Sequence, residues 1–299
     1  MIGGQVSSRP SAWVSWLLAI RPATLPAAVA PVLVGTAAAA DERFRLHIFV
    51  VTLAASLLIQ IGTNLANDLF DFERGADTTD RLGPLRVTQS GLIPLAQVRA
   101  AAYLAFGAAA AIGLYLVFVG GWPILAIGLA SIAAGLAYTG GPWPLGYHSL
   151  GDAACFVCFG LLAVIGTFYL QAEELSAVAF IAAVPVGLLV TAILVANNLR
   201  DIETDRRAGK LTLAVRLGDK GTRLQYTSFV LGAYVLLPLL LMVDVGPGLW
   251  LPWLTLPVAV ALAWAVASGT RGRALNPVLK RTAQLHLAFG ALLALGLLL

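Results

Sequence analysis

Long apolar runs, separated by short polar breaks, extend along almost the whole chain. The runs cover approximately residues 12–40, 46–69, 96–119, 121–139, 150–171, 176–197, 224–243, 250–268 and 282–299. A helix needs about 20 mostly apolar residues to cross the hydrocarbon core of a bilayer. The pattern therefore predicts an all-α membrane protein, a bundle of about nine transmembrane helices that forms one domain over residues 1–299.

The first run is interrupted by polar and helix-breaking residues. Arg21, Pro22, Pro26 and Pro31 all lie inside it. Proline removes a backbone donor and bends a helix. We therefore expect a tilted or kinked first transmembrane helix rather than a cleavable signal segment.

Composition excludes a water-soluble protein. Mean hydropathy is +0.87 and only 11% of residues are charged, whereas a soluble domain carries roughly a quarter. The net charge of +4 does not indicate a nucleic-acid partner, because basic residues concentrate in the cytoplasmic loops of membrane proteins. Apart from Arg43 and Arg45, every Lys and Arg belongs to the N-terminal segment or to alternate loops and their helix ends. The N-terminus and those loops are predicted to be cytoplasmic.

Two long polar loops, at about 64–95 and 197–223, contain most of the candidate metal-binding and diphosphate-binding residues. Four positions recur in both at an offset of 134 residues. The matched pairs are Asn64 with Asn198, Asn67 with Asp201, Asp71 with Asp205 and Gly75 with Gly209. We interpret this as a weak internal repeat that brings two polar helix ends together on the cytoplasmic side.

The acids within the repeat predict a metal–diphosphate site. Carboxylates four residues apart on one helix face repel each other, and near the hydrocarbon boundary they are also costly to desolvate. Mg²⁺ would offset both effects, since it is commonly shared between carboxylates and phosphate. The expected metal ligands are Asn67, Asp68, Asp71 and Asp77 in one site and Asp201 and Asp205 in the other. Expected diphosphate contacts are Asn64, Arg74, Arg81, Asn198, Arg200 and Lys210. The alternative is ordinary solvated charge that is paired internally.

Several stretches together resemble the UbiA superfamily of membrane prenyltransferases, in particular its menaquinone branch. They are residues 21–28, 67–77, 80–91, 138–142, 144–152, 197–205 and 209–218. Two positions depart from the general pattern. Gly75 replaces an acid of the first motif, and Pro142 replaces the lysine often found in the 4-hydroxybenzoate branch.

The resemblance implies a nine-helix enzyme of the cell membrane with its active site on the cytoplasmic side. It would transfer a prenyl chain from a polyprenyl diphosphate, with Mg²⁺, to 1,4-dihydroxy-2-naphthoate. Loss of CO₂ would then give a demethylmenaquinol. The expected catalytic residues are Asp71, Asp201, Asp205 and Tyr138, and the expected acceptor contacts are Arg86, Gln89, His148 and Asp152.

Two alternatives stay open at this point. A related enzyme could use another aromatic acceptor, such as homogentisate or 4-hydroxybenzoate. A secondary transporter could also show a repeat with intramembrane acids, although such sites usually lie near the bilayer midplane. The cysteines Cys155 and Cys158 lie in an apolar run, and we interpret them as packing residues.

Overall fold

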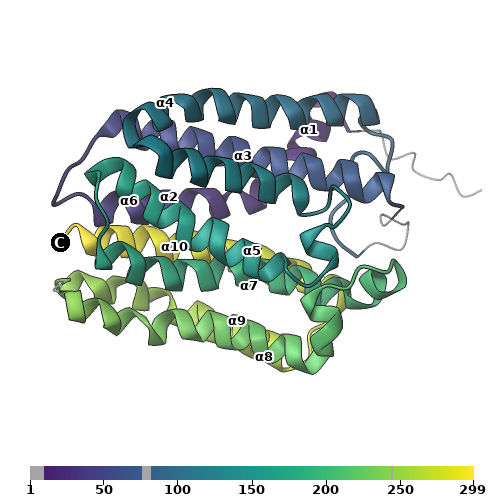
Figure 1. The fold of residues 1–299 in the computed structure, drawn as a ribbon. Coiled ribbons are helices and arrows are strands. Elements are labelled where there is room, and N and C mark those ends of the chain that lie inside the picture. Colours follow the sequence, from purple (N-terminus) through teal and green to yellow (C-terminus); the bar gives the residue numbers. More distant parts are fainter. Residues whose placement is uncertain (1–9, 76–81, 244) are drawn as a thin grey trace, which may run out of the picture.

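The computed structural model describes residues 10–75, 82–243 and 245–299, and these residues form a bundle of long helices (Figure 1). Within the described residues, nine helical segments are arranged to cross a membrane, as the hydrophobic pattern predicts. The first four are the bent pair α1 (Ala12–Ile20) and α2 (Pro26–Ala38), then α3 (Leu46–Glu73), and then the two halves of α4 (Leu95–Ala137).

The remaining five segments follow in chain order. They are α5 (Gly151–Cys155) with η3 (Phe156–Leu162) and α6 (Ala163–Ala172), then α7 (Ala177–Arg207), then α8 (Leu213–Val235) with η4 (Leu237–Val243), then η5 (Pro247–Thr255) with α9 (Leu256–Ala267), and finally α10 (Leu275–Leu297). The short helices η1 (Pro22–Thr24), η2 (Leu145–Tyr147) and η6 (Gly272–Ala274) lie in the connections.

The expected kink in the first transmembrane segment is present. α1 and α2 are bent by 48° relative to each other. Arg21 has a left-handed backbone with φ of 55°, and prolines occupy the first positions of η1 and α2. Because proline lacks an N–H group, a continuous helix cannot form through this segment.

The long helix α4 consists of two membrane crossings. Gly121 has φ of 68° and ψ of −157°, and Pro123 follows it. Glycine adopts this conformation without the penalty of a Cβ atom. The chain reverses there, and the two halves of α4 run back alongside each other (Figure 1).

Two helices extend further than hydropathy predicts. α3 continues to Glu73 and α7 to Arg207, whereas the apolar runs end at about 69 and 197. The repeated polar motifs therefore lie on the last turns of helices rather than in loops. A helix can continue past its apolar stretch because its backbone hydrogen bonds are satisfied internally, while its polar face meets protein rather than lipid.

Small residues allow the central helices to pack closely, as the high glycine content predicts. A Cβ atom at Gly160 would lie 2.5 Å from the Cα of Gly187, and one at Gly248 would lie 2.3 Å from the carbonyl oxygen of Gly296. Such contacts are typical of membrane helix interfaces. They place η3 directly against α7, and η5 against α10.

The functional connections gather at one end of the bundle, opposite the C-terminus (Figure 1). Hydrogen bonds join them there. The Arg74 side chain donates to the Thr139 carbonyl at 3.0 Å, Ser149 to the Leu211 carbonyl at 2.7 Å, and Asn276 to the Leu82 carbonyl at 3.0 Å. The fold thus brings together the connections that follow α3, α4 and α7.

Candidate active site

Asp68 and Asp71 of the first motif are buried and both lie beside Arg86. Arg86 Nη2 donates to Asp71 Oδ2 at 2.8 Å, and its Nε lies 3.6 Å from Asp68 Oδ1. Thr88 donates to Asp68 Oδ2 from its backbone nitrogen at 3.3 Å and from its hydroxyl at 3.2 Å. One guanidinium thus offsets the repulsion between two neighbouring carboxylates, which would be costly to bury alone.

Asn67 is positioned by the loop that follows α4. Thr139 donates from its hydroxyl to Asn67 Oδ1 at 2.9 Å. Arg74 donates to the Thr139 carbonyl at 3.0 Å and also to the carbonyl of Gly141. Arg74, which the sequence assigns to the diphosphate, therefore also anchors this loop to the end of α3.

The second motif is organised around Arg200. Arg200 donates through Nε to Asp201 Oδ1, through Nη1 to Asn276 Oδ1 and through Nη2 to Asn197 Oδ1, each at 2.8 Å. A Cβ atom on Gly83 would come within 2.6 Å of Arg200 Nη2. The connection after the first motif is therefore packed on the arginine of the second.

Tyr147 links the two motifs. Its hydroxyl donates to Asp71 Oδ1 at 3.0 Å. The Cζ of Arg74 and the Nζ of Lys210 each lie 5.3 Å from the centre of its ring, within range of a cation–π interaction. Burial raises the pKa of the Tyr147 phenol, and the negative charges of Asp71 and Asp205 raise it further. Tyr147 therefore stays protonated and keeps its donor for Asp71.

Tyr138 lies at the end of α4 with its ring held between two glycines. A Cβ atom on Gly146 would come within 3.2 Å of a Tyr138 ring carbon, and one on Gly151 within 3.0 Å of the Tyr138 hydroxyl. Tyr138 also lines the cavity described below.

A cavity of about 760 Å³ extends from the two motifs into the bundle. Its polar end includes residues of both motifs, namely Asn64, Asn67, Asp71, Asn197, Asn198, Arg200 and Lys210. Its far end is apolar and includes Leu116, Val117, Ile124 and Leu170. A cavity with one charged and one apolar end fits an amphipathic ligand with an anionic head and a long hydrocarbon tail.

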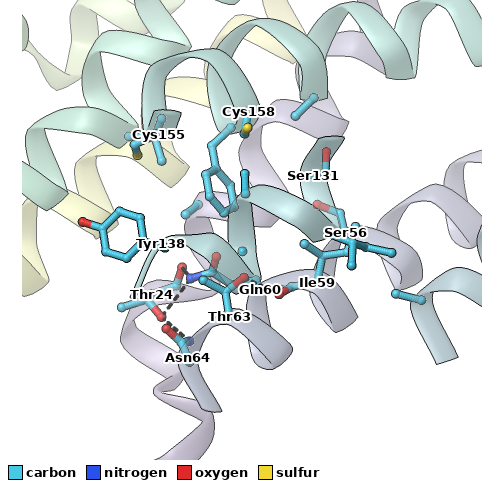
Figure 2. A pocket seen from close by; sticks show the side chains of 18 of the residues that line it. Thr24, Ser56, Ile59, Gln60, Thr63, Asn64, Ser131, Tyr138, Cys155 and Cys158 are labelled. Atoms are coloured by element: carbon cyan, nitrogen blue, oxygen red, sulfur yellow. Dashed lines mark hydrogen bonds between the residues drawn. The ribbon is translucent and has the colours of Figure 1, made fainter. Parts of the chain in front are cut away.

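Figure 2 shows part of the cavity wall, with Thr24, Gln60 and Asn64 grouped on one side and Tyr138 and Cys155 on another. Cys155 and Cys158, which we interpret from the sequence as packing residues, both line this cavity. They belong to the turn where α5 passes into the π-helix η3.

The expected acceptor residues are spread over different environments. Of the four, only Arg86 lies on the cavity wall in the described part of the chain. Asp152 accepts from Gln225 at 2.7 Å and from Asn198 at 3.4 Å, which ties α5 to α7 and α8. The His148 ring stacks on Trp143 with centroids 4.5 Å apart. Gln89 is half-buried in the turn after Thr88.

Two expected ligands, Asp77 and Arg81, lie outside the described residues. Among the residues that are described, no three acidic, histidine or cysteine side chains are grouped closely enough to hold a metal ion by themselves. The oxygens that are present suit Mg²⁺, which usually binds one or two carboxylates and completes its shell with water and substrate phosphate. Of the expected ligands that the structure describes, Asn67 and Asp71 line the cavity, while Asp68 lies beside Arg86 and Asp201 accepts from Arg200.

Sequence reasoning missed two residues of the site. Asn276 holds Arg200 from α10. Gln60 lines the cavity one turn before Asn64. The spacing of Gln60 and Asn64, four residues apart on the same helix face, was a usable signal for the last of these.

Comparison with known proteins supports this picture. The model of the UbiA prenyltransferase family matches residues 28–298. The chain is 42% identical over 282 residues to a 1,4-dihydroxy-2-naphthoate octaprenyltransferase of Mycobacterium tuberculosis, which covers 91% of this chain and 92% of that relative. It is 39% identical over 298 residues to the Escherichia coli protein of the same name, which covers 95% of each.

Solved structures have the same fold. A UbiA homologue from Aeropyrum pernix superimposes with a TM-score of 0.67 at 18% identity, over 96% of this chain and 98% of that chain. A UbiA homologue from Archaeoglobus fulgidus bound to GPP and Mg²⁺ gives a TM-score of 0.64 at 14% identity, over 94% and 99%. From the family match, the relatives and the shared fold, the chain belongs to the UbiA prenyltransferase family.

Proposed function

We propose that this protein is a Mg²⁺-dependent membrane enzyme that transfers a polyprenyl chain from its diphosphate to 1,4-dihydroxy-2-naphthoate. The carboxyl group of the acceptor is lost as CO₂, and the product is a demethylmenaquinol. The observation that carries the proposal is a single cavity that joins residues of both polar motifs to a long apolar space. The names of the bacterial relatives support the choice of acceptor.

The cationic side chains of the polar end bind the diphosphate. Arg200 and Lys210 line the cavity there, and Arg74, like Lys210, lies 5.3 Å from the centre of the Tyr147 ring. Guanidinium groups pair well with phosphate oxygens. The amide of Asn198 adds an uncharged contact, whereas the amide nitrogen of Asn64, which the sequence also assigns to the diphosphate, is held by the Ile20 carbonyl and Thr24. Arg81, which lies outside the described residues, is included among the diphosphate contacts on the basis of the sequence alone.

The oxygens of Asn67, Asp68, Asp71, Asp201 and Asp205 would hold Mg²⁺, with Asp77 as a further ligand by sequence. When bound, the metal neutralises the negative charge that develops on the leaving diphosphate. Arg86 and Tyr147 fix the two Asp71 oxygens in place through bonds of 2.8 and 3.0 Å. This leaves the carboxylate little freedom to reorient, so less reorganisation is needed during the reaction.

The apolar wall excludes water while the carbon–oxygen bond of the prenyl diphosphate breaks. The Tyr138 ring lies at the cavity wall near the polar end, where its face can stabilise an allylic cation. The electron-rich acceptor ring then supplies the electron pair for the new carbon–carbon bond. Exclusion of water matters because water would otherwise capture the cation.

We place the polar end of the bundle on the cytoplasmic side of the cell membrane, with the N-terminus on that side. The argument is the distribution of basic residues, of which only Arg43 and Arg45 belong to the opposite set of loops. Diphosphate and acceptor would thus reach the site from the cytoplasm or from the inner leaflet.

The test is turnover by detergent-purified protein with Mg²⁺, a polyprenyl diphosphate and 1,4-dihydroxy-2-naphthoate, with product and CO₂ measured. Parallel reactions contain 4-hydroxybenzoate or homogentisate. We expect product with the naphthoate alone, loss of activity in a chelator, and recovery with added Mg²⁺. Product only with another acceptor would overturn the acceptor assignment, and binding of prenyl diphosphate without any turnover would overturn the enzymatic one.

The metal role of Asp71 is tested with Asp71→Asn, which keeps the size of the side chain and removes its charge. We expect kcat to fall at least about 100-fold, since a carboxylate at the charge-bearing centre is lost. Asp41→Asn is the control, because Asp41 lies in the short connection between α2 and α3. Equal activity of Asp71→Asn and the unmodified protein would contradict a metal role for Asp71.

A further inference from the structure

A polar group in the cavity wall lies deeper than the two motifs. Gln60 and Asn64 are on α3, two turns and one turn before Asp68 respectively, and Thr24 is at the end of η1. All three line the cavity (Figure 2). At a rise of 1.5 Å per residue, Asn64 lies about 5 Å and Gln60 about 10 Å further along the helix axis than Asn67.

The orientation of both amides is fixed by their partners. Asn64 Nδ2 donates to the Ile20 carbonyl and to Thr24 Oγ1, both at 2.9 Å. The Thr24 hydroxyl donates to the Arg21 carbonyl at 2.9 Å, so its oxygen has only acceptor capacity left. Gln60 Nε2 lies 3.3 Å from that same oxygen and must donate to it. The amide nitrogens therefore face the protein.

The amide oxygens of Gln60 and Asn64 are left as acceptors. Neither oxygen receives a hydrogen bond from the residues that the structure describes. Both side chains are nevertheless more than nine-tenths buried, with 7% and 4% of their surface exposed. Since both residues line the cavity, an oxygen that has no donor from the protein becomes costly when an apolar ligand covers it. An apolar prenyl tail that covered these oxygens could not satisfy them, whereas a ligand with hydroxyl groups could.

We propose that Gln60 and Asn64, oriented by Thr24, form the subsite that binds the ring hydroxyl groups of the aromatic acceptor. This inference rests on the proposed function and names the part of the cavity where its acceptor lies. The two oxygens accept from the phenolic hydroxyls. They also repel a carboxylate, so the acid group of the acceptor points away from them, toward the cationic end where Arg86 and Arg200 lie. The ring is thereby oriented as well as bound.

The test compares substitutions at Gln60 with the loss of single ligand hydroxyls. In Gln60→Leu and Asn64→Leu we expect the KM for the acceptor to rise about 10-fold to 100-fold, and the KM for prenyl diphosphate to change less than about twofold. Thr63→Val is the matched control. Thr63 also lines the cavity, but its hydroxyl donates to the Ile59 carbonyl of its own helix at 2.8 Å.

Inhibition by naphthoates that lack one hydroxyl gives a second readout. The compounds are 1-hydroxy-2-naphthoate and 4-hydroxy-2-naphthoate, measured as competitive inhibitors of the acceptor. We expect the unmodified protein to bind at least one of them about 10-fold more weakly than the dihydroxy compound. In the corresponding leucine variant that difference should disappear, because the amide oxygen that accepts the hydrogen bond from the ligand hydroxyl has been removed.

The outcomes separate this inference from the proposed function. If the unmodified protein does not prenylate the naphthoate, the proposed function fails. If it does, and Gln60→Leu and Asn64→Leu leave the acceptor KM and the inhibitor preferences unchanged, the subsite is wrong. A rise in the KM values of both substrates together, or a similar effect of Thr63→Val, would indicate a general packing defect and would also overturn it.

Discussion

Single side chains at the polar end line the cavity and also hold the neighbouring elements together. Arg86 pairs with Asp71 at 2.8 Å while lining the cavity, and Arg200 pairs with Asp201 while it contacts α10 through Asn276. A lone acid or arginine here would be strongly unfavourable, since an isolated charge loses its hydration on burial. The charges are therefore stable as a set.

Tyr147 provides the sharpest prediction at this scale. Tyr147→Phe removes the hydrogen bond to Asp71 but keeps the ring contacts with Arg74 and Lys210. We expect kcat to fall about 10-fold with little change in the KM for prenyl diphosphate, because one hydrogen bond to a charged group is lost. Tyr147→Leu also removes the ring face and should raise that KM.

Steady-state kinetics with varied prenyl diphosphate and Mg²⁺ distinguish the two variants. Tyr103→Phe is the control, since Tyr103 is 52% exposed on α4, away from the site. Identical kinetics of Tyr147→Phe and Tyr147→Leu would show that the ring does not position Arg74 or Lys210.

Helix contacts decide how wide the cavity is and where the motifs lie. α7 is the most deeply buried of the long apolar helices, and it packs against η3 through Gly160 and Gly187. A π-helical turn in η3 shifts the register of the side chains that follow it. Cys158 and Phe159, which belong to η3, line the cavity.

Substitution of Gly160 tests this close contact. In Gly160→Ala the added methyl would lie 2.5 Å from the Cα of Gly187, so the helices must separate. We expect a loss of about 1–3 kcal/mol in the free energy of unfolding. The measurement is thermal or denaturant unfolding in detergent.

Gly107→Ala is the matched control for this prediction. Gly107 lies inside α4 with open space around its missing Cβ atom. Alanine is the better helix former, so this variant should be neutral or slightly more stable. Equal destabilisation by both substitutions would contradict the packing argument.

The whole molecule has two distinct ends. The connections that carry both motifs lie at one end, and the C-terminus lies at the other (Figure 1). The cavity begins at the first of these ends and extends to Leu116 and Ile124 near the reversal of α4. The cavity thus extends along the length of the bundle, with its charged end at the motifs and its apolar end toward the reversal of α4.

Membrane orientation gives the prediction at this scale. Fusion of alkaline phosphatase after Leu299 should be active, because the C-terminus is expected outside, whereas a fusion at Gly269 should be inactive. Gly269 follows α9 in the basic connection to α10. Fluorescent-protein fusions at the same two points should give the reverse result. Phosphatase activity at Gly269 with none at Leu299 would invert the assigned topology.

The hydrophobic pattern by itself determined the nine crossings, the kink near Arg21 and the reversal at Gly121. These features depend on local physics, because lipid demands about 20 apolar residues per crossing, and clustered prolines near Arg21 and a glycine with positive φ at Gly121 break the helix locally. The spacing of Asn67 and Asp71, and of Asp201 and Asp205, likewise identified the candidate acids. Helix ends were placed too early, because hydropathy falls before the helix itself ends.

Only the tertiary structure decided which polar groups meet. The pairing of Asp71 with Arg86 and Tyr147, and the contact of Arg200 with Asn276, join residues 15 to 76 positions apart. The same holds for Thr24 and Gln60, 36 positions apart, whose contact turns two amide oxygens toward the cavity. Conversely, Gln89, His148 and Asp152 look suited to binding by sequence, yet they lie off the cavity wall. A hydrogen bond depends on distance and direction in space, and a single sequence without its packing contains neither.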